Sequence, residues 1–143
     1  MFEKQNYEER LAIWRDFRES LNESKDPVQD VINFYSTAST VRMHTDPYDM
    51  NSWPDPWELL EENIYCNYCI LLGICYTLQL SGCFKGEPAE IHIGINREKS
   101  DTWYLLKIAN TIIGYESNDE YIRTMELPEN LHIQKIHYLA SRQ

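Results

Sequence analysis

Three of the four cysteines lie in one largely apolar stretch, residues 61–82, which reads EENIYCNYCILLGICYTLQLSG. Cys66 and Cys69 are separated by two residues, and Cys75 follows in the same stretch. A thiolate can act as a nucleophile, as a metal ligand or as a partner in disulfide exchange. The stretch therefore allows four interpretations: a redox pair, a metal site, plain core packing, or a helix that carries a nucleophile.

The redox and metal interpretations fit the surrounding sequence poorly. A redox Cys-x-x-Cys begins a helix that follows a strand, whereas the segment PWELLEEN before Cys66 predicts a short helix. A zinc site from Cys66, Cys69, Cys83 and His92 would draw on a helix, its far end and a strand, without the usual spacing of zinc ligands. We expect no metal ion and no cofactor.

Core packing explains Cys75 and is adequate for Cys69, because free cysteines commonly behave as small buried hydrophobes. Cys66 differs, because it stands at the start of the predicted helix. There, unpaired N–H groups and the helix dipole favour a thiolate and can bind an oxyanion, so we expect Cys66 to be an exposed nucleophile. His92, on the polar face of the next predicted strand, is the candidate base, although a lone strand histidine is more often a surface or satisfied residue.

The first half of the chain predicts helices and the second half predicts strands. The predicted helices span residues 7–22, 27–35, 56–63 and 65–80, with Asp26 as the N-cap of the second. Residues 40–56 predict a loop with a short extended piece at 41–44, and strands are predicted at 89–98, 102–109, 110–115, 120–127 and 131–139, the last also compatible with a helix. This order predicts a single α+β domain over residues 1–143, in which N-terminal helices and a buried cysteine-bearing helix pack on an antiparallel sheet.

The charge of the chain argues against two classes of partner. Thirteen basic residues against twenty-three acidic ones give a net charge of −10, which repels nucleic acid and anionic membrane surfaces. The cysteine pattern favours reduced thiols, and no apolar run is long enough for a membrane span, so we expect a cytoplasmic protein. The oligomeric state is left open.

From residue 46 to residue 108 the sequence resembles the transglutaminase-like cysteine hydrolases, most closely their bacterial cysteine-proteinase branch. The matching segments are DPYDMNSWPDPWELLEENIYC before the cysteine, CNYCILLGICYTLQLSG as the cysteine helix, EIHIGIN as the histidine strand and TWYLLK as the acid strand. The resemblance implies a papain-like fold and attack on a peptide or amide bond through a thioacyl intermediate. It also implies that Cys66 is the nucleophile and His92 the base.

The sequence departs from the family pattern where an aspartate should orient the histidine. Lys107 occupies that position and cannot accept a hydrogen bond from an imidazole. Asn110, just beyond the strand, is the candidate replacement, although it also suits a turn, and Glu90 and Asn96 on the face of His92 are the alternatives. Acidic residues between positions 43 and 84 favour a neutral or cationic peptide or protein substrate. The alternative is a catalytically degenerate copy of the fold that serves as a binding or structural protein.

Overall fold

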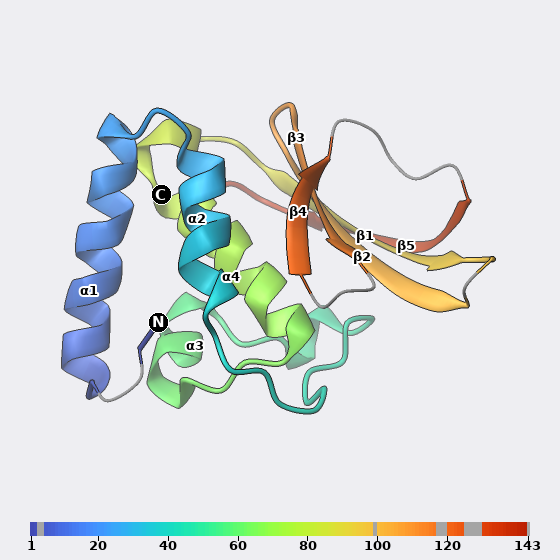
Figure 1. The fold of residues 1–143 in the computed structure, drawn as a ribbon, viewed down its shortest axis with the longest axis horizontal. Helices are drawn as coiled ribbons and strands as arrows, with labels where there is room; N and C mark the ends of the chain where they lie inside the picture. Colours follow the sequence, from blue (N-terminus) through green and yellow to red (C-terminus); the bar gives the residue numbers. More distant parts are fainter. Residues whose placement is uncertain (3–4, 99, 117–119, 125–129, 143) are drawn as a thin grey trace.

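The computed structural model describes residues 1–2, 5–98, 100–116, 120–124 and 130–142 (Figure 1). Within these residues, four α-helices precede five strands, which confirms the predicted α+β class. The elements are α1 (Tyr7–Ser20), α2 (Pro27–Ser36), α3 (Pro56–Glu62), α4 (Asn67–Leu80), β1 (Ala89–Asn96), β2 (Asp101–Ile108), β3 (Thr111–Glu116), β4 (Glu120–Thr124) and β5 (Leu131–Leu139). None of the helices described is long and apolar enough to cross a bilayer.

The helix starts follow local capping chemistry. The Asp26 side chain accepts a hydrogen bond from the Gln29 N–H, as predicted, and Pro27 begins α2. α3 begins with a capping box between Asp55 and Glu58. The extended piece predicted at 41–44 is not a strand, since only an isolated bridge between Thr40 and Tyr65 forms nearby.

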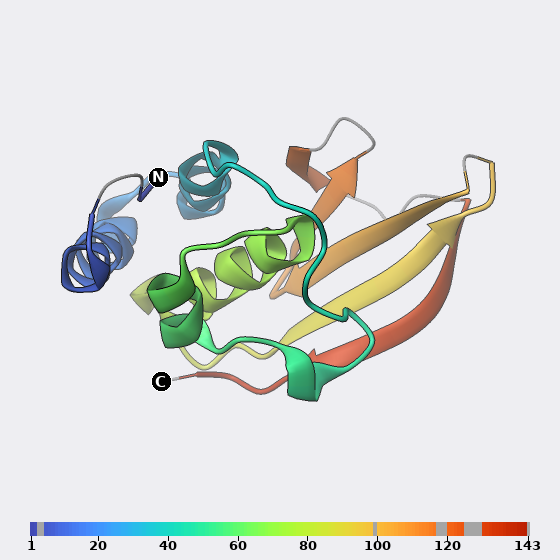
Figure 2. The same ribbon diagram turned by 90° about the horizontal axis from the view of Figure 1, so that it is seen from below.

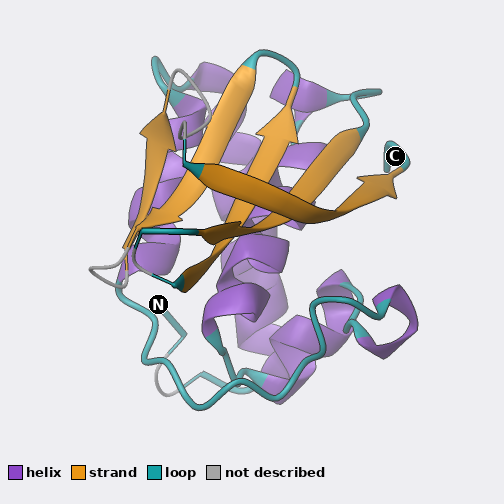
Figure 3. Ribbon diagram, turned by 90° about the vertical axis from the view of Figure 1, so that its right-hand side faces the viewer, coloured by secondary structure: helices purple, strands orange, loops and turns teal. Residues whose placement is uncertain are grey.

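The five strands form one antiparallel sheet in the order β4-β3-β2-β1-β5. Residues 131–139, which were also compatible with a helix, form a strand because they pair with β1 along its whole length. The pairing register shifts between Ile93 and Gly94, and β5 bends across the sheet in Figure 3. β1 therefore lies between two paired neighbours, β2 and β5.

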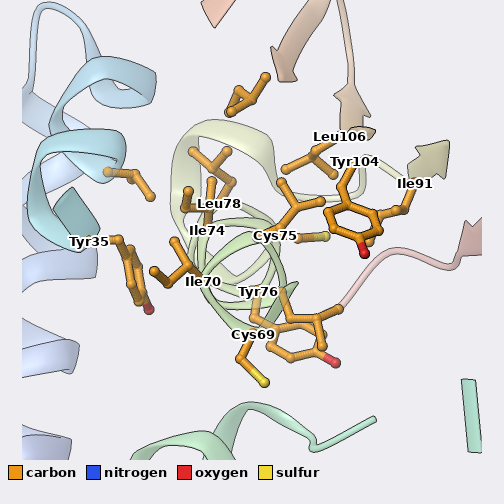
Figure 4. Packing of buried hydrophobic residues seen from close by; sticks show 14 of the residues in the cluster. Tyr35, Cys69, Ile70, Ile74, Cys75, Tyr76, Leu78, Ile91, Tyr104 and Leu106 are labelled. Carbon is orange, nitrogen blue, oxygen red and sulfur yellow. The ribbon is translucent and has the colours of Figure 1, made fainter. Parts of the chain in front are cut away.

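Helix α4 is the centre of the core. It lies between α1 and α2 on one side and the sheet on the other (Figure 2), and twelve of its fourteen residues are buried. Ile91 and Ile93 of β1 and Leu106 of β2 are fully buried in the same cluster as the α4 side chains (Figure 4). The predicted buried cysteine helix on an antiparallel sheet is confirmed, with Cys75 fully buried.

A single hydroxyl on α4 joins three helices. Thr77 Oγ1 donates to the Gly73 carbonyl at 2.7 Å, and it accepts from Trp14 Nε1 of α1 at 2.9 Å. The Tyr35 hydroxyl of α2 lies 3.0 Å from Thr77 Oγ1, and this oxygen has a second lone pair that accepts its hydrogen bond. All these groups are buried, so the Thr77 hydroxyl supplies hydrogen bonds to polar atoms that water does not reach.

Replacing Thr77 by valine should lower the free energy of unfolding by about 2 kcal/mol, because it removes the hydroxyl to which the buried Trp14 and Tyr35 side chains are hydrogen-bonded. Replacing it by serine keeps the hydroxyl and removes one methyl group, at a cost of about 1 kcal/mol. Urea denaturation of the two variants measures the difference. A valine variant as stable as the serine variant would contradict this role for the hydroxyl.

Candidate functional site

The loop between α2 and α3 covers the N-terminus of α4, as Figures 1 and 2 show. Three hydrogen bonds fix this loop. The Val41 N–H donates to the Tyr65 carbonyl at 2.9 Å, and Trp53 Nε1 donates to the Asp46 carbonyl at 2.9 Å. His137 Nε2 of β5 donates to the Pro47 carbonyl at 2.8 Å, which ties the loop to the sheet. The loop is therefore held at both the helix and the sheet.

Cys66 and Cys69 lie beneath this loop and have 0 % exposed surface. The expectation that Cys66 is exposed at the helix start is wrong, because a helix end usually open to solvent is covered here. Cys83, beyond the C-terminal end of α4, is the exposed cysteine. Cys66 occupies the N-cap position of α4, and its side chain forms no regular capping hydrogen bond.

The environment of Cys66 favours its thiolate. A hydrogen bond from the Cys69 thiol lowers the pKa of Cys66 most, and the backbone N–H groups of His44 and Cys69 lower it further. Burial opposes these effects but does not cancel them. The same hydrogen bond, with burial, raises the pKa of Cys69, so Cys69 keeps its proton and donates it toward Cys66.

His44 is the histidine at this site. A ring nitrogen of His44 and the sulfur atoms of Cys66 and Cys69 all lie within 4.8 Å of one another. Thr45 Oγ1 lies 3.3 Å from the Cys69 sulfur and 3.5 Å from His44 Nδ1, so it links the two. His44 is exposed, whereas Thr45 is buried. The site therefore combines buried sulfur atoms with an imidazole that is exposed to solvent.

Sequence reasoning missed His44, although it is one of only four histidines in the chain. It stands twenty-two residues before Cys66, in a loop with no periodic pattern, and no local motif relates it to the cysteines. The one available signal was its place directly before the turn residues Asp46 and Pro47. Its contact with the cysteines arises from the path of the loop.

His92 lies on the other face of the sheet. Its neighbours Ile91 and Ile93 face α4 and the core, so strand alternation points His92 away from the cysteine helix. In Figure 3 this outer face is toward the viewer, with the helices behind the sheet. His92 Nε2 lies 3.5 Å from a Glu90 carboxylate oxygen, and among the described residues neither ring nitrogen has a hydrogen-bond partner. The structure does not bring this imidazole to Cys66.

Asn110 and Lys107 are also placed away from the cysteines. Asn110 lies in the turn between β2 and β3, and Ile108 pairs with Ala89 at the start of β1. His92 lies three residues farther along β1, which is about 10 Å from Ala89. Lys107 pairs with Glu90 on the outer face. The third member proposed for the triad is therefore separated from His92.

The zinc set considered from the sequence is not assembled either. Cys83 follows the C-terminal end of α4, about 21 Å of helix away from Cys66, and its thiol donates to the Leu21 carbonyl at 3.0 Å. His92 lies on the outer face of the sheet. The metal-capable cluster found in the described part of the chain instead combines Cys66 and Cys69 with His44.

Comparisons of the chain with protein-family models, with curated proteins and with solved structures gave no match. The resemblance to transglutaminase-like hydrolases therefore rests on the residues quoted above.

The pH dependence of stability should report on the histidine that holds the loop. Burial, with a smaller effect of Lys135, lowers the pKa of His137, and the bond to Pro47 only partly offsets this. As pH falls through about 6.5 the unfolded chain binds a proton before the folded one does, so stability decreases toward the folded pKa.

The free energy of unfolding should therefore decrease between pH 7 and pH 5, and His137→Gln should flatten part of that decrease. Urea denaturation at several pH values provides the measurement. An identical pH slope in the variant would show that His137 does not contribute to it.

Proposed function

We propose that Cys66 is the nucleophile of a cysteine hydrolase or acyl transferase that acts on a peptide or amide bond. The observation that carries the proposal is the position of its sulfur at the N-terminus of α4, beside two backbone N–H groups and the His44 imidazole. Such a sulfur attacks a carbonyl carbon as a thiolate, and helix N-terminal N–H groups can stabilise the resulting oxyanion.

A transglutaminase-like architecture is part of this proposal. Its support is the order of elements: a helix with a cysteine at its start, then an antiparallel pair of strands packed against that helix. The direction of His92 argues against the family's usual Cys–His pair. We therefore assign the role of base to His44, which lies within 4.8 Å of the Cys66 sulfur.

In this mechanism His44 takes up and returns the proton. Cys66 attacks the carbonyl carbon, a Cys–acyl bond forms, and the protonated imidazole gives its proton to the leaving amine. Water then attacks the thioester, with His44 accepting the water proton, and releases the acid and the Cys66 thiolate. Thr45 orients the imidazole through its contact with Nδ1.

The neighbourhood of the site favours a neutral or cationic peptide. Asp46 and Asp49 lie exposed on the covering loop, and no lysine or arginine occurs between Met43 and Phe84. Met43 and Tyr48 on the same loop are 42 % and 49 % exposed, and these apolar side chains suit contact with a peptide.

A second candidate function is a degenerate hydrolase fold that binds a partner or has a structural role. The complete burial of Cys66 favours it, because a substrate carbonyl can reach the sulfur only if the loop over α4 moves. Reactivity of the thiol in the folded protein distinguishes the two candidates.

Iodoacetamide should modify Cys66 before Cys69 and Cys75 in a Cys83→Ser background, which removes the exposed competing thiol. Cys66 is favoured as a thiolate, whereas Cys69 retains its proton and burial raises the pKa of Cys75 to about 12. Brief labelling with a chelator present, followed by fragmentation mass spectrometry, locates each modification. If all three thiols react equally, and only when the protein is unfolded, the result would favour the degenerate fold with a binding or structural role.

A matched pair of histidine variants identifies the base. His44→Gln should slow modification of Cys66, and it should slow any hydrolysis on the order of 10²-fold, since it removes the adjacent imidazole. His92→Gln should leave the modification rate of Cys66 unchanged, because His92 points to the outer face of the sheet. The opposite pattern would restore the pairing of Cys66 with His92 inferred from the sequence.

A further inference from the structure

Three side chains meet at the N-terminus of α4, and together they offer one nitrogen and two sulfur atoms as possible metal ligands. Cys66 and Cys69 stand three residues apart at the N-terminus of α4, and the covering loop adds His44. All three donor atoms lie within 4.8 Å of one another. These residues come from two segments of the chain, so the cluster depends on how the loop packs against the helix.

The spacing suits a tetrahedral zinc ion. Zinc binds thiolate sulfur at about 2.3 Å and imidazole nitrogen at about 2.0–2.1 Å, which places neighbouring donor atoms of a tetrahedron about 3.5–3.8 Å apart. Donor atoms at the observed upper limit of 4.8 Å would therefore need to approach one another by about 1.0–1.3 Å. Because His44 is exposed and carried by a loop, its side chain can supply that movement.

The surroundings also resemble those of a metal centre. The N-terminal N–H groups of α4 favour negative charge on the sulfur atoms, and Thr45 contacts both Cys69 and His44. The sulfur atoms are buried, while the neighbouring His44 is exposed, so an ion needs to pass only this side chain and the edge of the loop. In the described residues the cluster has three members, which leaves the fourth position for Thr45 Oγ1, water or another small ligand.

We propose that His44, Cys66 and Cys69 bind one zinc ion, and that this ion switches off the Cys66 nucleophile. Binding forms two Zn–S bonds and one Zn–N bond, and Cys69 releases its thiol proton to solvent. The ion occupies the sulfur lone pair that would attack a carbonyl, so the metal-bound form is inactive and removal of the metal restores the thiolate. The switching role rests on the proposed function, whereas the metal site stands independently of it.

Cobalt(II) is the probe for this site, because tetrahedral cobalt bound to thiolates gives sulfur-to-metal charge-transfer absorption and intense visible bands. The full chain in the Cys83→Ser background should bind one cobalt ion with both features, and zinc should displace it. Cys66→Ser and Cys69→Ser should each remove much of the charge-transfer intensity. His44→Gln should weaken cobalt binding about 10- to 100-fold or more.

His44 is exposed, so His44→Gln keeps the test valid even where a variant at a buried cysteine fails to fold. His92→Gln is the matched control and should bind cobalt like the parent, because its imidazole lies on the outer face of the sheet. A parent protein without charge-transfer absorption, or a His44→Gln variant with unchanged affinity, would overturn the metal site.

Alkylation with and without zinc tests the switch separately. Zinc should protect Cys66 and Cys69 from iodoacetamide, and a chelator should restore the reaction at Cys66. Cobalt binding without preferential alkylation of metal-free Cys66 would keep the metal site and reject the nucleophile. Preferential alkylation without cobalt binding would keep the nucleophile and reject the metal site.

Discussion

The burial of α4 on almost every side is the constraint on which the rest of the structure depends. A helix that carries Ile70, Leu71 and Leu72 in succession, followed by Ile74, has no polar face to turn to solvent. Helices α1 and α2 cover one side and the sheet covers the other, as Figure 2 shows. The polar groups enclosed by this packing need partners inside the core, and the Thr77 hydroxyl meets this need for Trp14 and Tyr35.

The same constraint shapes the N-terminus of the helix. The first N–H groups of any helix lack partners within it, and here the covering loop restricts their access to water. At the N-cap, where serine or aspartate would supply oxygen, the chain has the sulfur of Cys66. The backbone donors beside that sulfur favour its charged form, while the Cys69 thiol and the His44 imidazole lie close by. The packing of the helix therefore also sets the environment that favours the thiolate of Cys66.

The two proposed roles of this site depend on the same property. A thiolate near backbone N–H groups is both a nucleophile and a soft metal ligand, and an adjacent imidazole can act as a base or as a ligand. Access separates the two roles. A peptide carbonyl needs the loop to move away from Cys66, whereas a single ion needs a much smaller opening, and the neighbouring His44 is exposed.

Local chemistry and periodicity in the sequence determined the order and type of the elements. Asp26 and Pro27 set the start of α2, the apolar run set α4, and alternation set β1, because each signal acts over a few neighbouring residues. Burial of Cys75 also followed from that run.

The tertiary structure decided which histidine meets the cysteines. Alternation along β1 already placed His92 and Ile91 on different faces of the strand. Only the packing of α4 against the isoleucine face showed that His92 points away from the cysteine helix. His44 reaches Cys66 and Cys69 because the bonds at Val41, Asp46 and Pro47 fold the loop across the helix end. The bonds at Val41 and Pro47 join the loop to residues far apart in the chain, Tyr65 and His137, so no local pattern of residues could reveal them.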